Sequence, residues 1–198
     1  MKAIKTAAPP RALAAIVIGA SAGGVHALLE ILGKLPAGFS LPLIVALHLP
    51  EDRKSQLATI FQHRLSIPVR EAADKEVIVP GTLYFAGPGY HLSVEMDRSF
   101  SLSCEAPVNH ARPSIDFLME SAADAYGPAL AGILLTGAND DGAAGLARIG
   151  ELGGLTIVQD PVQAEARAMP EAALRRMQPD HVLSLGAIHT LLLELGHA

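Results

Sequence analysis

Short apolar runs recur along this chain, and each is followed within a residue or two by glycine or a polar residue. Runs of this length without polar alternation are typical of strands buried on both faces; they cover residues 14–18, 43–47, 131–135 and 155–158. Segments with apolar residues at helical spacing lie between them, for example 24–35 with Val25, Leu28 and Leu32. This strand–helix–strand order predicts an α/β fold with a mostly parallel, doubly wound sheet flanked by helices.

The middle of the chain has a different pattern. Three short strands are expected at 82–86, 91–95 and 99–104, the last two joined as a hairpin through Met96, Asp97 and Arg98. We therefore expect a small antiparallel hairpin insertion near residues 82–104. The remaining predictions are a strand at 181–183 and helices at about 52–65, 114–126 with Ser114 as N-cap, 142–152 and 187–195.

Length and charge narrow the class of protein. The 198 residues, half of them apolar, suit one domain over 12–198 preceded by a flexible N-terminal lead over 1–11. A net charge of −5 without a basic stretch argues against nucleic acid as a partner. The single cysteine, Cys104, suits a reducing compartment, and no apolar stretch approaches the ~20 residues of a membrane span. We expect a cytoplasmic protein without membrane insertion.

A glycine-rich loop, Gly19 to Gly24, joins the first strand to the first helix. Its Gly-x-Ser-x-Gly pattern matches a nucleophile elbow, which would expose the hydroxyl of Ser21 above the sheet. The alternative is a nucleotide or phosphate cradle of a Rossmann-like module. In that fingerprint a glycine occupies the place of Ser21, and an acid rather than His48 ends the second strand. A tight turn without chemistry is equally compatible with this loop alone.

Two further strand ends carry a base and an acid. His48 directly follows the second strand, and Asp141 lies in the turn that follows the strand at 131–135. His91 is the best substitute among the other histidines, and one of Asn139, Asp140 and Asp141 is expected to cap the next helix.

The ends of parallel strands meet at one edge of a sheet, so Ser21, His48 and Asp141 should come together there. Serine needs a base to take its proton, and the histidine needs an acid to orient it, so this set suits nucleophilic acyl transfer. The chain order Ser, His, Asp differs from the Ser, Asp, His order of α/β-hydrolases.

Several segments together resemble the catalytic domain of the chemotaxis protein-glutamate methylesterases (CheB type). The matches follow the family's order and spacing over about residues 14–195; they are Ile-Gly-Ala-Ser-Ala-Gly-Gly at 18–24, Leu-His-Leu-Pro at 47–50, Ala-Pro-Val-Asn-His-Ala-Arg-Pro-Ser-Ile-Asp at 106–116, and Leu-Leu-Thr-Gly at 134–137 through Asp-Gly-Ala at 141–143. Weaker echoes occur at 85–91, 159–160 and 169–170.

The resemblance implies hydrolysis of glutamate methyl esters on the cytoplasmic helices of methylated chemoreceptors, together with deamidation of receptor glutamines in many members. It implies Ser21 as nucleophile, His48 as general base and Asp141 as orienting acid. It also places Ala22 and Ala138 at the oxyanion hole or lining the site. No cofactor and no metal are implied.

The chain departs from the family pattern at several places. Ala138 and Asn139 stand where the family usually has Met and Gly, and Ala22 where it often has Thr. The backbone N–H of Ala138 survives the first substitution, whereas a left-handed backbone at Asn139 would be strained. The best-known members also carry a receiver domain, which residues 1–11 are too short to form, so we expect a free-standing member or a fragment.

Arg112, in the turn before the helix at 114–126, is a candidate for docking an acidic receptor helix. A catalytically silent receptor-docking homologue is a further alternative for the whole chain.

Overall fold

The computed structural model describes residues 12–48 and 55–196, so the predicted lead at 1–11 lies outside the described residues. A seven-stranded sheet runs through the molecule in the order β3-β4-β2-β1-β7-β8-β9, and every neighbouring pair is parallel. Its strands are β1 (Ala15–Ala20), β2 (Leu43–Leu47), β3 (Val69–Glu71), β4 (Leu83–Phe85), β7 (Leu130–Leu134), β8 (Leu155–Gln159) and β9 (His181–Leu183).

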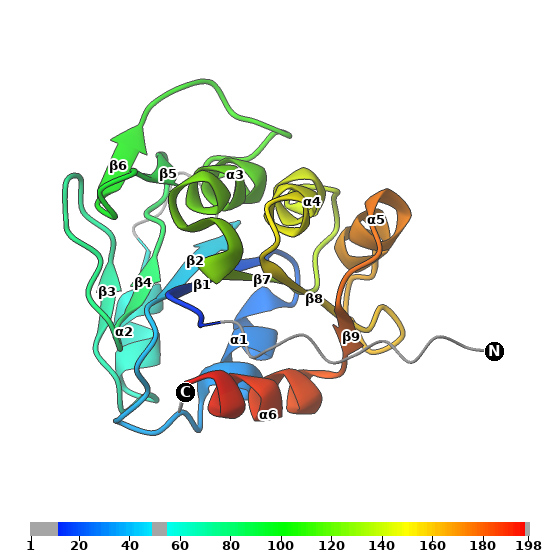
Figure 1. Ribbon diagram of the computed structural model, residues 1–198, viewed down its shortest axis with the longest axis horizontal. Coiled ribbons are helices and arrows are strands. Elements are labelled where there is room, and N and C mark those ends of the chain that lie inside the picture. The colour runs from blue at the N-terminus through cyan, green and yellow to red at the C-terminus, as the bar shows by residue number, and fades with distance from the viewer. Residues whose placement is uncertain (1–11, 49–54, 197–198) are drawn as a thin grey trace.

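Helices cover both faces of this sheet (Figure 1), as the doubly wound prediction requires. On one face lie α1 (Gly24–Leu32), α2 (Leu57–Gln62) and α6 (Leu185–Leu195); on the other lie α3 (Ile115–Tyr126), α4 (Ala143–Glu151) and α5 (Ala168–Arg176), and a 3-10 turn, Gly127–Ala129, links α3 to β7. The central strand β1 is buried along its length. Its side chains alternate between two cores, Ala15 and Val17 facing the α3 side and Ile16 and Ile18 the α1 side.

The antiparallel insertion is smaller than the sequence indicated. Strands β5 (His91–Val94) and β6 (Phe100–Ser103) form the predicted hairpin as a separate two-stranded sheet. The strand expected at 82–86 belongs instead to the main sheet as β4, paired in parallel with β2 and β3. Its side chains are buried on both sides, so it follows the rule for parallel strands and was wrongly grouped with the insertion.

Two elements were missed and one was predicted too long. Strand β3 has only three residues, two of them charged and exposed, and α5 is a polar helix that buries little more than Met169, Pro170, Ala172 and Ala173. Neither carries a strong apolar period. Helix α2 covers Leu57–Gln62 of the stretch expected at 52–65, whose first three residues lie outside the described residues. Among the described helices, none combines the length and the apolar character needed to cross a membrane.

Helices α3 and α4 approach each other closely at Gly145. A Cβ on this glycine would lie 2.5 Å from the Cβ of Met119 and 3.1 Å from the carbonyl oxygen of Asp116. The small side chain therefore determines how near the N-terminal turns of the two helices can lie.

We predict opposite effects for two helical Gly→Ala substitutions. Gly145→Ala should lower the free energy of unfolding by about 1–3 kcal/mol, because the added methyl overpacks the α3–α4 contact. Gly186→Ala, in the open part of α6 with nothing within 4 Å, should raise it by about 0.5–1 kcal/mol through helix propensity. Urea unfolding of both variants measures the difference, and a stabilised Gly145→Ala protein would contradict the close approach.

Candidate active site

Three loops meet at the carboxyl edge of the sheet because β2, β1 and β7 are neighbours. Ala20 at the end of β1 pairs with Leu47 at the end of β2, and Gly19 pairs with Leu134 at the end of β7. Ser21 and His48 directly follow β1 and β2, and the turn at 136–142 is separated from the end of β7 by one residue. The register therefore brings together the three strand ends that the sequence singled out.

Backbone hydrogen bonds join the serine loop to its neighbours. The N–H of Ser21 donates to the carbonyl of Thr136 at 2.9 Å, and the N–H of His48 donates to the carbonyl of Ala20 at 3.2 Å. After Ser21 the chain turns sharply at Gly23, whose φ of 77° lies in the left-handed region that glycine adopts without strain. Helix α1 starts at the next residue, which leaves the serine at a sharp strand-to-helix corner.

His48 and Asp141 form a hydrogen-bonded pair. The Nε2 of His48 lies 2.7 Å from Oδ2 of Asp141; the carboxylate is fully buried, while the imidazole keeps 14% of its side-chain surface exposed. Because an ionised carboxylate only accepts hydrogen bonds, Nε2 carries the proton, and in the neutral imidazole Nδ1 then keeps its lone pair. Within the described residues, the hydroxyl of Ser21 makes no hydrogen bond, including none to His48.

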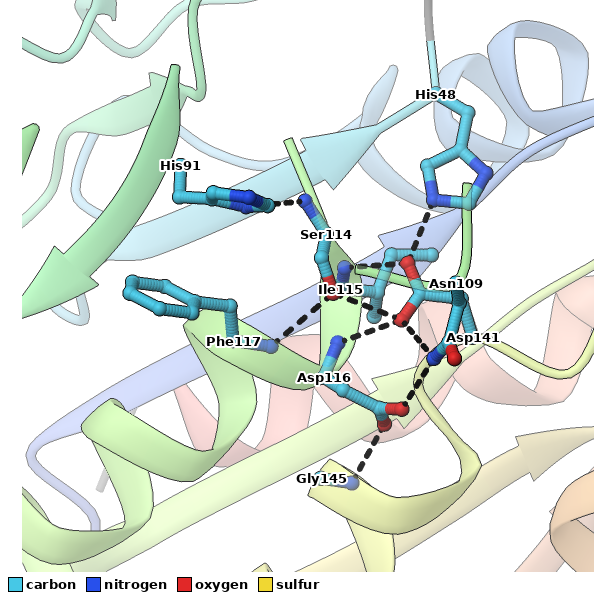
Figure 2. Close-up of polar contacts among 9 residues, drawn as sticks. All are labelled: His48, His91, Asn109, Ser114, Ile115, Asp116, Phe117, Asp141 and Gly145. Atoms are coloured by element: carbon cyan, nitrogen blue, oxygen red, sulfur yellow. Dashed lines mark hydrogen bonds and ion pairs between the residues drawn. The ribbon is translucent and has the colours of Figure 1, made fainter. Parts of the chain in front are cut away.

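Asp141 also accepts hydrogen bonds from the first turn of α3 (Figure 2). Its carboxylate receives the backbone N–H groups of Ile115 at 2.7 Å and Asp116 at 3.0 Å, and the hydroxyl of Ser114 at 2.9 Å. Helix N-termini favour negative charge, because their first N–H groups have no partner within the helix. The helix thus holds an acid that lies 25 residues further along the chain.

This arrangement corrects one prediction. The helix after the acidic turn, α4, has Gly142 as its N-cap and no side-chain capping bond, so none of Asn139, Asp140 and Asp141 caps it. Asp141 instead accepts the first backbone N–H groups of α3. The predicted cap of α3 is confirmed, since Ser114 accepts the N–H of Phe117.

The donors around Asp141 control its ionisation. Burial by itself would raise the pKa of Asp141, but the hydrogen bonds from His48, Ile115 and Asp116 outweigh it and bring this pKa below the ordinary value for aspartate. The carboxylate is therefore ionised at neutral pH and can hold and stabilise a histidine that gains a proton.

His91, the substitute base suggested by the sequence, has a structural role, because both of its ring nitrogens contact backbone groups. It is fully buried, its Nδ1 accepts the N–H of Ser114 at 3.2 Å, and its Nε2 bonds the carbonyl of Ala106 at 3.1 Å. Its ring stacks on Phe117 at 4.8 Å between centroids. Both nitrogens are thus committed to holding the start of α3, and His91 is not a candidate base.

Two pockets border His48. One, of about 410 Å³, is mostly apolar and is lined by Ser21 and His48 together with Val25, Leu29 and Leu47 of the surrounding elements. The other, of about 260 Å³, is lined by His48, His110, Arg112 and Asn139 among others. Ser21 and the exposed edge of His48 therefore face the same space, which can hold the side chain of a substrate.

Ala22 and Ala138, predicted to be at the oxyanion hole or to line the site, lie in adjoining loops. The hydroxyl of Thr136 donates to the carbonyl of Ala22 at 2.9 Å and so connects the two loops. Both alanines are exposed, and within the described part of the chain neither N–H donates to a protein acceptor. Asn139 is not among the described residues with positive φ, so the strain anticipated there is absent from its backbone.

Arg112, the predicted docking residue, lines the second pocket and also supports the loop before α3. Its Nη1 donates to the carbonyl oxygens of Cys104 at 3.2 Å and Glu105 at 3.1 Å. These bonds join the end of β6 to the turn in which Arg112 lies. Its docking role remains a prediction.

Sequence reasoning assigned no role to the residues that hold the Thr136 turn. The side chain of Gln159 accepts the N–H of Thr136 at 2.8 Å, and the hydroxyl of Thr136 accepts the N–H of Ala166 at 2.8 Å. Thr136 and Gln159 are polar residues at the ends of apolar runs, and both are buried in the structure. A polar residue at the end of an apolar run is the sequence signal that could have identified them. Their polarity at buried positions is explained by these backbone contacts.

The fold is a doubly wound α/β sheet, and the candidate site carries the residue types of a serine hydrolase. The family model for the CheB methylesterase matches residues 16–192, and the chain belongs to that family.

A relative from Leptospira interrogans, provisionally named a protein-glutamate methylesterase/protein-glutamine glutaminase, is 45% identical over 181 residues that cover 91% of this chain and 94% of its own length. The protein-glutamate methylesterase FrzG of Myxococcus xanthus is 33% identical over 193 residues, covering 98% of this chain and 58% of FrzG. The crystal structure of the CheB methylesterase catalytic domain of Thermotoga maritima superimposes with a TM-score of 0.87 at 31% identity, over 92% of this chain and 98% of that one.

The lowered pKa of Asp141 predicts how the stability of the Asp141→Asn variant depends on pH. An aspartate whose pKa is lower in the folded state stabilises that state above its unfolded pKa of about 3.9, and this stabilisation is lost as the pH falls through the folded value. The variant should be about 1–3 kcal/mol less stable at pH 7, because an amide cannot accept all the donors that surround the carboxylate. The difference between parent and variant should shrink steadily below about pH 4. Denaturant unfolding across pH checks this, and a difference independent of pH would contradict the ionised, helix-bound carboxylate.

Proposed function

We propose that this protein is a protein-glutamate methylesterase that hydrolyses methyl esters of glutamate side chains with Ser21, His48 and Asp141 as its catalytic residues. The observation that carries the proposal is the 2.7 Å bond between His48 and Asp141, beside a pocket that His48 shares with Ser21. Membership of the CheB methylesterase family supports the same reaction. The proposed partners are the cytoplasmic helices of methylated chemoreceptors or similar methylated proteins, and the proposed location is the cytoplasm.

The first half of the reaction transfers the acyl group to the enzyme. The oxygen of Ser21 attacks the γ-carbonyl carbon of the ester while Nδ1 of His48, whose Nε2 is bonded to Asp141, takes the hydroxyl proton. The ester carbonyl oxygen becomes an oxyanion, which the N–H groups of Ala22 and Ala138 can receive. Collapse of this tetrahedral intermediate breaks the bond to the methoxy oxygen. His48 returns its proton to that oxygen, methanol leaves, and a glutamyl ester of Ser21 remains.

The second half restores the serine. A water molecule attacks the glutamyl ester, His48 takes one of its protons, and the C–O bond to Ser21 breaks as the proton passes to the serine oxygen. The products are the original enzyme and a glutamate carboxylic acid, which releases its proton to water at neutral pH and becomes a carboxylate. Asp141 stays ionised throughout and stabilises the imidazolium that forms twice in the cycle.

The same steps accommodate glutamine deamidation, with ammonia as the leaving group in place of methanol. Both substrates present a γ-carbonyl to Ser21 and give the same acyl-enzyme. We therefore propose protein-glutamine deamidation as a second activity of the same site, in keeping with the names of several relatives.

The nucleotide-binding alternative is disfavoured by the charge beside the glycine loop. A Cβ on Gly23 would lie 2.7 Å from Oε2 of Glu165, so a carboxylate already sits next to the start of α1. A phosphate at that helix N-terminus would meet this negative charge.

The Ser21→Ala variant tests the proposed nucleophile. Methanol release from a methylated chemoreceptor cytoplasmic fragment should fall at least ~10³-fold, because no other hydroxyl replaces the one that forms the acyl-enzyme. Unchanged release by the variant would refute Ser21 as nucleophile. Absence of release by the parent protein as well would favour the catalytically silent docking homologue.

The proposed docking role of Arg112 makes a separate prediction. Arg112→Ala should raise KM for the methylated protein by about tenfold, as expected for the loss of ~1.4 kcal/mol of binding, and leave KM for a small glutamate methyl ester unchanged. Because Arg112 also bonds two carbonyls, Arg112→Lys serves as a control that retains the charge. Equal effects on both substrates would remove the docking role and leave the loop-supporting one.

A further inference from the structure

A second buried carboxylate lies beside Asp141, and the proposed reaction does not use it. Asp116 is the second residue of α3 and keeps only 8% of its surface exposed. A buried acid needs hydrogen-bond donors to offset the loss of water. The identity of those donors indicates what Asp116 does.

One donor belongs to α4. The Oδ1 of Asp116 accepts the backbone N–H of Gly145, in the first turn of that helix, at 2.7 Å. Asp141, two residues before the first residue of α4, accepts in turn the first N–H groups of α3. Asp116 of α3 thus bonds the start of α4, and Asp141, just before α4, bonds the start of α3. These reciprocal contacts join the two helix N-termini at two points.

Another donor, the amide of Asn109, is shared by the two carboxylates. The amide Nδ2 of Asn109 lies 2.9 Å from Oδ2 of Asp116 and 3.2 Å from Oδ1 of Asp141. Figure 2 shows both contacts from the one amide. Asn109 has a φ of 50°, in the left-handed region that asparagine tolerates better than most residues. Its NH₂ group has two hydrogens, one for each acid, so a single side chain bridges both.

The bridge matters because the two acids repel each other. Burial is the main cause that raises the pKa of Asp116, and the negative charge of Asp141 raises it further, against the opposing hydrogen bond from Gly145. Without a donor between them, this repulsion would push the Asp141 carboxylate away from Asp116, against the hydrogen bonds that hold it to α3. Any such movement also displaces His48, which is bonded to the other carboxylate oxygen.

We propose that Asn109 and Asp116 are positioning residues that keep the Asp141 carboxylate aligned with His48. The proposal rests on the catalytic role proposed for Asp141. Asn109 acts directly by its hydrogen bond, and Asp116 acts by orienting the Asn109 amide and by anchoring the first turn of α4. Neither residue touches the substrate's reacting atoms.

Two variants test the proposal. Asn109→Gly removes the bridging amide while tolerating the left-handed backbone. Asp116→Asn replaces a carboxylate that accepts from two donors by an amide, whose NH₂ must face either the Asn109 amide or the N–H of Gly145. Each should lower kcat for methanol release about 10–100-fold, because small displacements of catalytic groups have effects of this size, and should change KM less than twofold. Asp124→Asn, an exposed acid on the same helix, is the matched control and should keep the parent's kcat.

A double-mutant cycle and a spectroscopic signal separate positioning from loss of fold. Adding Asn109→Gly to Asp141→Asn should lower kcat no further, since the residue to be positioned is already gone. In the single variants, the downfield ¹H NMR resonance of the Nε2 proton of His48 should move upfield while the melting temperature stays above the assay temperature. An additive effect on kcat or an unshifted resonance would overturn the proposal.

The experiment distinguishes this proposal from the proposed function. If Asp141→Asn lowers kcat and Asn109→Gly does not, the positioning role is wrong and the catalytic role of Asp141 stands. If Asp141→Asn itself retains the parent's kcat, the proposed role of Asp141 is wrong, and the positioning proposal falls with it.

Discussion

The carboxylate of Asp141, fully buried against the N-terminus of α3, is the interaction on which the candidate site depends. It accepts hydrogen bonds from two backbone N–H groups, a serine hydroxyl, an asparagine amide and an imidazole. A negative charge in a protein interior is tolerated only with such a set of donors. The same donors fix the direction of each carboxylate oxygen, so the orientation of His48 follows from the packing of α3 on the sheet.

The close packing of α3 and α4 depends in turn on small residues. A Cβ on Gly19 would lie 2.3 Å from Ile115, and one on Gly142 would lie 2.6 Å from the same side chain. These two glycines let the first turn of α3 descend onto the ends of β1 and β7. Gly145 then admits α4 against Met119. The site is therefore held by rigid elements rather than by loops alone, which suits a catalytic group that has to be placed within a fraction of an ångström.

Buried polar residues outside the proposed triad complete this framework. His91 holds the N–H of Ser114, Thr136 joins the serine loop to the turn after β7, and Gln159 secures that turn from the next strand. Each is a polar side chain at a buried position, and each meets a backbone group that would otherwise lack a partner. Ala138 and Asn139, which depart from the usual family pattern, lie in a turn whose backbone these contacts support. The turn therefore keeps these backbone contacts despite both substitutions.

The sequence by itself determined the parallel α/β fold and the three strand ends that carry Ser21, His48 and Asp141, because uninterrupted apolar runs and glycine turns are local signals. It could not show that Asp141 bonds α3 rather than α4, or that His91 is fully committed to structure, because those contacts join residues 23 to 26 positions apart through helix packing. It missed α5 and β3, whose polar residues carry no apolar period. The proposed roles of Asn109 and Asp116 were also not visible in the sequence. Both residues belong to a recognisable motif, but only the tertiary structure places Asp141 between them and His48.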